Sequence, residues 1–260
     1  MEIGICTSPE SALTLPENAC DFIEANVQNL LVPEKDEKEF APNLEAVRKI
    51  AKPTKAACCF LPGDLKCVGP KIDHERLLRY SEAAFVRAEQ ARIEIIVFGS
   101  GGARTVPEGY PMEKAMKEFV DLLRLIGPIA ARHGVTVVVE PLNKGECNFI
   151  TSLKDGAAAV EQCNHPNVRL LADIYHMLQD GEPAAQITKF GHLLSHVHVA
   201  EVAGRFFPGK AREDHREFFR ALKGTGYKGR ISIESHWDDL QTDAVPSVQY
   251  LREQLADAGL

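Results

Sequence analysis

Four apolar runs in the second half of the chain end in side chains that can bind a metal or move a proton. These side chains are Glu140; Asp173 and His176; His196, His198 and Glu201; and Glu234 and His236. A single carboxylate after an apolar run is usually a strand terminus or a helix cap. Four such runs delivered to one edge bring like charges together, which is costly unless a cation or shared protons compensate.

Carboxylates and imidazoles at that edge indicate a hard, divalent metal. Three carboxylates and one imidazole form a mostly oxygen ligand set, which suits Mn²⁺, Mg²⁺ or Co²⁺ better than a thiolate-rich zinc or iron site. Manganese is the first choice. Strand alternation puts His196 and His198 on the same side of their strand, so alternation alone does not separate a ligand from its neighbour.

The elements that position these residues alternate between short apolar runs and longer segments with helical spacing. The predicted strands are 2–6, 29–32, 56–61, 93–98, 135–140, 169–173, 196–200 and 230–234. The predicted helices include 74–91, 112–133, 153–163, 215–224 and 245–258. Gly134 and Gly224 stand where helices should stop, as expected of residues that accept left-handed geometry.

Eight such units favour a closed α/β barrel over an open sheet. A (β/α)₈ TIM barrel takes about 250 residues in one domain, and this chain has 260, so we expect one TIM-barrel domain over residues 1–260. An open dinucleotide-binding sheet would need a glycine-rich turn after its first strand, and the segment 6–10 has no glycine. In a TIM barrel the carboxyl ends of the strands build the active site.

Composition narrows the class of protein. Hydrophobic residues make up 45% and charged residues 26% of the chain, which is close to the globular average. The net charge of −7 argues against broad nucleic-acid binding. No apolar run reaches the length of a membrane span, and we expect a cytoplasmic protein with no membrane partner. The seven cysteines are scattered, with no pair at zinc-ligand spacing, which fits reduced thiols.

Five motifs give the sequence a specific resemblance. They are GluProLeuAsn from 140, AspIleTyrHis from 173, HisValHis at 196–198, ArgPhePheProGly from 205 and IleSerIleGlu ending at 234. These motifs resemble the metal and substrate motifs of the ketose 3-epimerases, the tagatose and psicose 3-epimerase type. That family belongs to the xylose isomerase-like superfamily of sugar isomerases and epimerases.

The resemblance implies a role for each matching residue. It implies that Glu140, Asp173, His198 and Glu234 bind one divalent metal, and that Glu146, His176 and Arg205 contact the substrate oxygens. It also implies a homo-oligomer, a dimer or tetramer. One departure is a segment before Pro208 that is a residue longer than the family pattern, which bears on the choice of sugar more than on the metal.

A metal and two carboxylates can invert a carbon next to a ketone. The metal stabilises the enediolate left when a proton is removed, and carboxylates on opposite faces of the sugar can remove and return the proton. Glu140 and Glu234 are the expected acid/base pair, and C3 epimerisation of a keto sugar is the expected reaction. An aldose–ketose isomerase, a hydroxypyruvate isomerase and an inosose-type dehydratase remain alternatives on the same site.

Two other hypotheses assign the chain to different classes of protein. Endonuclease IV, an abasic-site nuclease of the same superfamily, needs additional histidines from the early strands, and residues 1–130 contain only His74. A binding protein that keeps the barrel without catalysis is disfavoured by the retention of both carboxylates. Lys210 and Arg212 leave open a phosphorylated or acidic sugar, and Trp237 is a candidate pocket or oligomer contact.

Overall fold

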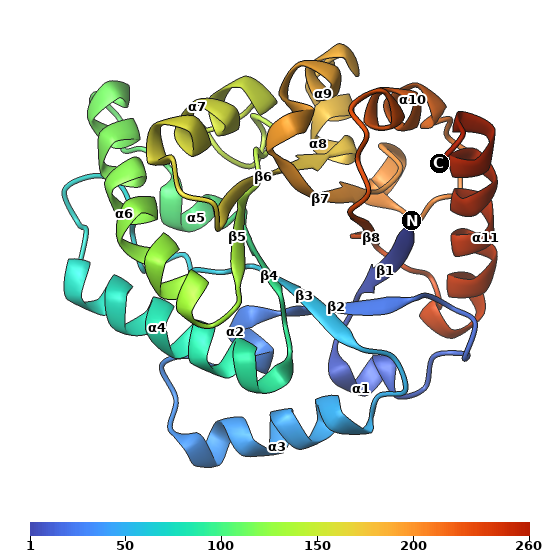
Figure 1. Cartoon of the computed structure of the whole chain (residues 1–260), viewed down its shortest axis with the longest axis horizontal. Coiled ribbons are helices and arrows are strands. Elements are labelled where there is room, and N and C mark those ends of the chain that lie inside the picture. The colour runs from blue at the N-terminus through green and yellow to red at the C-terminus, as the bar shows by residue number, and fades with distance from the viewer.

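Eight parallel strands form a closed barrel in the computed structural model, which describes residues 1–260. Each strand pairs with the next along the chain, and the first also pairs with the last, with Ile3 opposite Ile231. The longer helices lie around the outside of the barrel (Figure 1). The prediction of a (β/α)₈ barrel is confirmed.

The strands are four to six residues long. They are β1 Glu2–Cys6, β2 Phe22–Asn26, β3 Thr54–Cys58, β4 Ile95–Phe98, β5 Thr136–Val139, β6 Val168–Asp173, β7 Leu194–Val199 and β8 Arg230–Ile233. The helices are α1 Pro9–Ala12, α2 Val27–Leu30, α3 Glu37–Lys49, α4 His74–Ala91, α5 Gly101–Arg104, α6 Met112–Arg132, α7 Leu153–Cys163, α8 Ile174–Gln179, α9 Ala185–Phe190, α10 Arg216–Gly224 and α11 Leu240–Ala258. None of these helices is both long enough and apolar enough to cross a membrane.

The second predicted strand, 29–32, is wrong. Strand β2 lies earlier, at Phe22–Asn26, and most of the predicted segment belongs to the short helix α2 and the turn after it. The side chain of Asn26 accepts a hydrogen bond from the backbone N–H of Asn29, which starts the helix directly at the strand end. Glu24, in the middle of β2, breaks the apolar pattern that would have marked this strand.

Smaller differences occur at other element ends. Helix α11 begins at Leu240, capped by the side chain of Asp239, although the predicted helix begins at 245. Gly134 has a φ of 67° just after α6, which confirms its predicted role. Gly224 is instead the last residue of α10, and Gly226 takes the left-handed conformation, with a φ of 73°. Strand β3 lies two to three residues earlier than predicted.

Inward-pointing side chains fill the barrel in layers. A buried cluster in the interior comprises Phe22, Ala56, Cys58, Ile95, Val97, Val138 and Leu171. Gly4 leaves room for the ring of Phe22, because a Cβ at that position would overlap it. In a strand, residues two apart point to the same face. Two residues after Phe22, Val138 and Leu171 the chain has the acidic residues Glu24, Glu140 and Asp173. The apolar layer therefore supports a polar layer at the carboxyl ends of the strands.

Candidate metal centre

The four side chains implied as metal ligands meet at the carboxyl end of the barrel. Glu140 follows β5, Asp173 ends β6, His198 lies in β7 and Glu234 follows β8. One ligand atom from each lies within 4.8 Å of the corresponding atom of the other three. Consecutive strands deliver the four side chains, so the closed sheet itself sets their spacing. The structure brings together all four predicted positions.

The imidazole of His198 lies between the carboxylates. Its Nδ1 atom is 2.9 Å from Glu140 Oε1, 3.4 Å from Glu234 Oε2 and 3.9 Å from Asp173 Oδ2. The His198 side chain has no solvent-exposed surface. A positive charge at or beside this nitrogen would stabilise the three carboxylates that surround it.

A buried oxygen of Asp173 supports the hypothesis that this site binds a metal. Asp173 Oδ2 is buried and has no hydrogen-bond partner. A buried carboxylate oxygen without a partner is costly, and a cation that it ligates would remove that cost. Three carboxylates and one imidazole also match the hard donor set that Mn²⁺ and Mg²⁺ accept. The residues present therefore fit a divalent metal ion.

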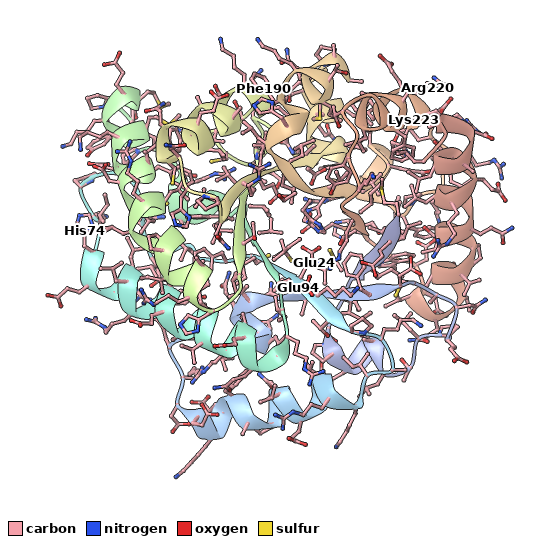
Figure 2. All side chains as sticks on the ribbon, viewed as in Figure 1. Glu24, His74, Glu94, Phe190, Arg220 and Lys223 are labelled. Carbon is pink, nitrogen blue, oxygen red and sulfur yellow. The ribbon has the colours of Figure 1, made fainter.

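Glu24 is part of this centre, and the sequence interpretation missed it. It points from β2 into the middle of the barrel (Figure 2) and is fully buried. Its Oε1 accepts a hydrogen bond from Nε2 of His198 at 2.9 Å, and its Oε2 accepts one from Nε2 of His196 at 2.8 Å. Glu24 thus turns Nδ1 of His198 toward the other three carboxylates. A carboxylate behind a metal-binding histidine commonly fixes its orientation in this way.

The two candidate acid/base carboxyls have opposite pKa shifts. Burial raises the pKa of Glu140, and the hydrogen bond with His198 offsets this only in part. Burial also acts to raise the pKa of Glu234, but the charge of His198, its hydrogen bond and the charge of Arg205 outweigh burial and lower the pKa to about 2. Glu140 therefore holds a proton more readily than Glu234.

The pKa of His198 is also set by burial acting against nearby charges. Burial would lower it, but the charges of Glu24 and Glu234 outweigh burial and raise it well above its usual range. The imidazolium lies against Glu24, Glu140 and Glu234, and the guanidinium of Arg205 is a second positive charge beside Glu234.

The three predicted substrate residues lie beside the four-residue cluster. Arg205 Nη2 donates to Glu234 Oε2 at 2.6 Å, and Arg205 Nη1 donates to Glu146 Oε1 at 3.3 Å. His176 Nε2 is 3.5 Å from Asp173 Oδ2 and is buried without a hydrogen-bond partner. All three residues therefore face the same space as the carboxylates.

A further residue, Asn143, connects two of them and was missed from the sequence. Its Nδ2 donates to Glu146 Oε1 at 2.9 Å and lies 2.8 Å from Nδ1 of His176. It lies in the GluProLeuAsn motif quoted above, three residues after Glu140, and an amide so close to a predicted ligand is the signal that could have found it. Asn143 occupies Nδ1 of His176 and leaves Nε2 as the ring nitrogen without a partner.

A cavity of about 320 Å³ joins these groups. Its lining includes Gln28, Cys59, Glu140, Glu146, His176, Arg205 and Glu234. Small-molecule sites usually measure about 300–1,000 Å³, so this cavity matches a small ligand. Polar groups converge on it from both the early and the late loops of the barrel.

Glu201 anchors the loop that carries Arg205 through hydrogen bonds to the loop backbone. Glu201 is fully buried and accepts hydrogen bonds from the backbone N–H groups of Gly209, Ala211 and Glu213. Arg205 therefore does not pair with Glu201, whose carboxylate is already engaged, and pairs with Glu234 and Glu146 instead. Arg205 has a φ of 52°, an unusual left-handed conformation that this anchored loop maintains.

The aromatic and basic residues next to this loop make their contacts outside the cavity. The ring of Trp237 stacks on Phe207, with centroids 5.0 Å apart. Lys210 forms an ion pair with Asp238, and the guanidinium of Arg212 lies over the ring of Tyr250. Trp237, Lys210 and Arg212 do not line the 320 Å³ cavity. These cations therefore give no support to a phosphorylated or acidic sugar.

Comparisons with known proteins point to one family. A family model described as xylose isomerase-like TIM barrel matches residues 17–256. The 3-dehydro-D-guloside 4-epimerase of Escherichia coli (strain K12) is 28% identical over 212 residues, which cover 76% of this chain and 79% of that protein. The L-ribulose 3-epimerase of Methylomonas sp. (strain DH-1) is 32% identical over 117 residues, which cover 45% of this chain and 41% of that protein.

Solved structures agree on the fold. The crystal structure of a D-allulose 3-epimerase from Methylomonas sp. superposes with a TM-score of 0.84 at 21% identity, over 98% of each chain. Proteins named hydroxypyruvate isomerase are also among the relatives. The relatives are thus sugar epimerases and isomerases.

Proposed function

Because the chain belongs to the xylose isomerase-like TIM barrel family and is an isomerase-type enzyme, we propose that it is a metal-dependent epimerase of a small keto sugar. Glu140, Asp173, His198 and Glu234 would hold one divalent ion, with Mn²⁺ as the first choice and Mg²⁺ or Co²⁺ as alternatives. The observation that carries the proposal is the buried cluster of these four ligand atoms within 4.8 Å of one another.

His198 would ligate the ion through Nδ1. Its Nε2 already donates to Glu24, so Nδ1 is the nitrogen that faces the three carboxylates. The buried Asp173 Oδ2, which has no other partner, would gain one. When bound, a divalent ion supplies a positive charge that polarises the ketone and stabilises negative charge on the enediolate.

Glu140 and Glu234 would move the proton. They follow β5 and β8, and both line the cavity. One of the two carboxylates would accept the proton, and the other, in its protonated form, would return one. Transfer to and from opposite faces inverts the carbon next to the ketone, and the roles exchange in the reverse direction.

Glu146, His176 and Arg205 would orient the sugar. All three line the cavity, and Arg205 also lies 4.6 Å from the centre of the Tyr175 ring, which limits its movement. The cavity volume of about 320 Å³ is at the small end of ligand sites, which favours a monosaccharide over a longer chain. In a 2-keto sugar, the carbon next to the ketone that is inverted is C3.

A second candidate is inversion at C4 of a 3-keto glycoside. The relative that aligns with 76% of the chain is named a 3-dehydro-D-guloside 4-epimerase. The chemistry is the same, because C4 of such a sugar is also next to the ketone. The two candidates differ in how the sugar lies in the cavity, which the proton-transfer groups alone do not determine.

Product analysis tests the proposal. Protein stripped with a chelator and then reloaded with Mn²⁺ is incubated with 2-ketohexoses, 2-ketopentoses and 3-keto glycosides, and the products are separated by chromatography. We expect an epimer only with the metal and not with Glu140→Gln, while Glu182→Gln, a carboxylate outside the cavity, stays active. Formation of an aldose instead would identify an aldose–ketose isomerase, and loss of water would identify a dehydratase.

A further inference from the structure

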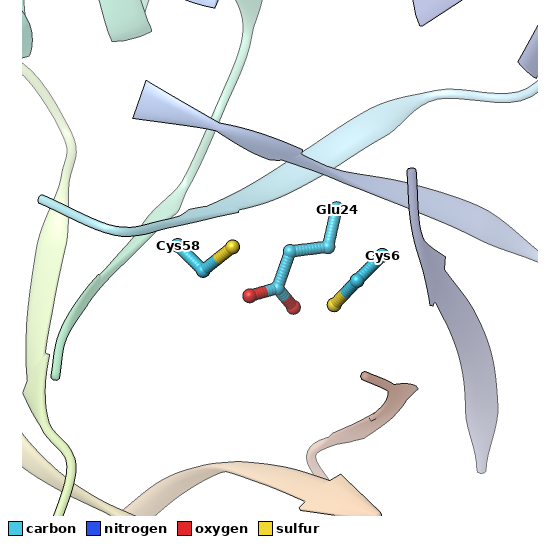
Figure 3. Close-up of side chains that lie close together, drawn as sticks. All are labelled: Cys6, Glu24 and Cys58. Carbon is cyan, nitrogen blue, oxygen red and sulfur yellow. The ribbon is translucent and has the colours of Figure 1, made fainter. Parts of the chain in front are cut away.

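Two cysteines and Glu24 meet on the side of the barrel opposite the late strands. Cys6 ends β1, Cys58 ends β3, and Glu24 lies in β2 between them. Figure 3 shows the two sulfur atoms on either side of the Glu24 carboxylate. The two Sγ atoms and a carboxylate oxygen of Glu24 all lie within 4.8 Å of one another. All seven cysteines are free thiols, and the fold brings two that are far apart in the sequence to one carboxylate.

The distances suit coordination of a single ion. Zinc binds sulfur at about 2.3 Å and carboxylate oxygen at about 2.0–2.2 Å, so ligand atoms around one tetrahedral zinc are roughly 3.5–3.8 Å apart. The observed separations, all within 4.8 Å, are close to this spacing. Each oxygen of Glu24 accepts one hydrogen bond from a histidine and keeps a second lone pair.

A cavity gives access to this cluster. It measures about 370 Å³, and Cys6, Glu24 and Cys58 line it together with Thr7, Asn26 and Asn43. It is distinct from the 320 Å³ cavity, and the two share no lining residue. Three protein ligands beside an open cavity leave a fourth position for water or a small ligand, as in zinc sites that are not purely structural.

We propose that Cys6, Glu24 and Cys58 form a second metal site, which binds a thiophilic divalent cation of the Zn²⁺ class. Each thiol gives its proton to solvent as its S–metal bond forms, and the carboxylate binds as the anion, so no oxidant or reductant is needed. Thiolate ligands select zinc or cadmium, whereas the oxygen-rich centre selects manganese or magnesium. The barrel mouth thus offers two sites of different hardness.

The two sites share one residue. Glu24 would ligate the thiophilic ion and also holds His198 of the other centre through a hydrogen bond. Occupation of the thiol site would therefore change the position or basicity of His198. The second site does not depend on the proposed epimerase function, because none of its three ligands is among the four proposed ligands of the oxygen-rich centre and the two cavities share no lining residue.

Cobalt titration tests the site directly. Reduced, metal-stripped protein is titrated with Co²⁺ in the presence of excess Mg²⁺, and thiolate-to-cobalt charge-transfer absorption is recorded in the near ultraviolet. We expect a band that saturates at one Co²⁺ per chain, is lost in Cys6→Ser and Cys58→Ser, and is kept in Cys163→Ser. Cys163 is a matched control, since it is a buried thiol on α7, outside both cavities.

A measurement on the unaltered protein covers variants that fail to fold. Peptide mass spectrometry after iodoacetamide treatment, with and without Zn²⁺, reports which thiols the ion protects. Protection of Cys6 and Cys58 but not Cys163 supports the proposal. Absence of the cobalt band, a band that persists in folded Cys58→Ser, or equal alkylation with and without Zn²⁺ would overturn it. Inactivity toward every keto sugar would leave these results unchanged.

Discussion

We call the carboxyl ends of β5 to β8 the late half of the barrel rim, and those of β1 to β3 the early half. The two halves present different ligand chemistry to the two sides of His198. The late half supplies three carboxylates and faces Nδ1 of His198, whereas the early half supplies two thiols and Glu24, which faces Nε2. The barrel places both groups at the carboxyl ends of parallel strands, so one architecture supports both. The identity of the inward side chain at each strand end, rather than the fold, would decide which ion each half accepts.

The largest expected effect is in the late half. Glu234→Gln removes a proposed acid/base group and weakens the oxygen-rich site, so we expect epimerisation to fall by about a thousandfold or more. Steady-state kinetics with Mn²⁺-loaded protein measure this loss. Cys58→Ser, a change in the early half, should leave Mn²⁺ binding intact. Equal loss of Mn²⁺ binding in both variants would show that the two halves form a single site.

A substitution that crowds Glu140 tests the late half without altering a ligand. A Cβ at position 99 would overlap Oε2 of Glu140, so Gly99→Ala should displace that carboxylate while the chain still folds. Misplacement of a catalytic group by about 1 Å can cost about a hundredfold in rate. Gly63→Ala is the matched control in the same cavity, because its nearest neighbour would be 3.8 Å away. Similar activity in both variants would contradict the placement of Glu140.

Glu24→Gln breaks the connection between the halves. The amide has one acceptor oxygen and no negative charge, so it cannot accept hydrogen bonds from both His196 and His198, and the hold on His198 is weakened. Changes to such supporting carboxylates typically cost about 10–100-fold in metal affinity. Isothermal titration with Mn²⁺ measures the change. Ser232→Ala, which loses only a contact to His196, should bind Mn²⁺ normally; unchanged affinity in Glu24→Gln would show that His198 is oriented by other contacts.

The sequence was informative about the late half because its strands are regular. Clear apolar runs precede Glu140, Asp173 and Glu234, so their positions at strand ends could be read from the pattern, and the structure brings them together. The choice of His198 over His196 came from resemblance, and the structure gives its physical basis: both histidines reach Glu24, but only His198 also faces the carboxylates.

The early half could not be predicted for a physical reason. Glu24 is a charged residue in the middle of a buried strand, and it is stabilised by two histidines far away in the sequence. No local pattern records such a partner, and the strand was therefore placed too late in the chain. Cys6 and Cys58 lie on strands that are not adjacent, and the pairing of both strands with β2 brings their sulfur atoms to the same carboxylate.

The smallest expected effect is a pH dependence from a carboxyl outside both halves. Burial raises the pKa of Glu182 from 4.5 to about 7, although it accepts hydrogen bonds from the backbone N–H of Leu153. Between these values the folded chain binds more protons than the unfolded chain, so the free energy of unfolding should fall as the pH rises. Urea unfolding at about pH 5 and about pH 8 should show this decline, and Glu182→Gln should reduce it. A decline of the same size in the variant would place its origin in other groups.

Solvent deuterium at C3 tests most directly the claim that two carboxylates of the late half act on opposite faces of a keto sugar. Mn²⁺-loaded protein in D₂O is given a 2-ketohexose that it converts, and both sugars are examined by NMR at early times. We predict deuterium at C3 of the new epimer and unlabelled C3 in the remaining substrate. An epimer that keeps the original hydrogen, or deuterium at C1 or C2, would contradict the account.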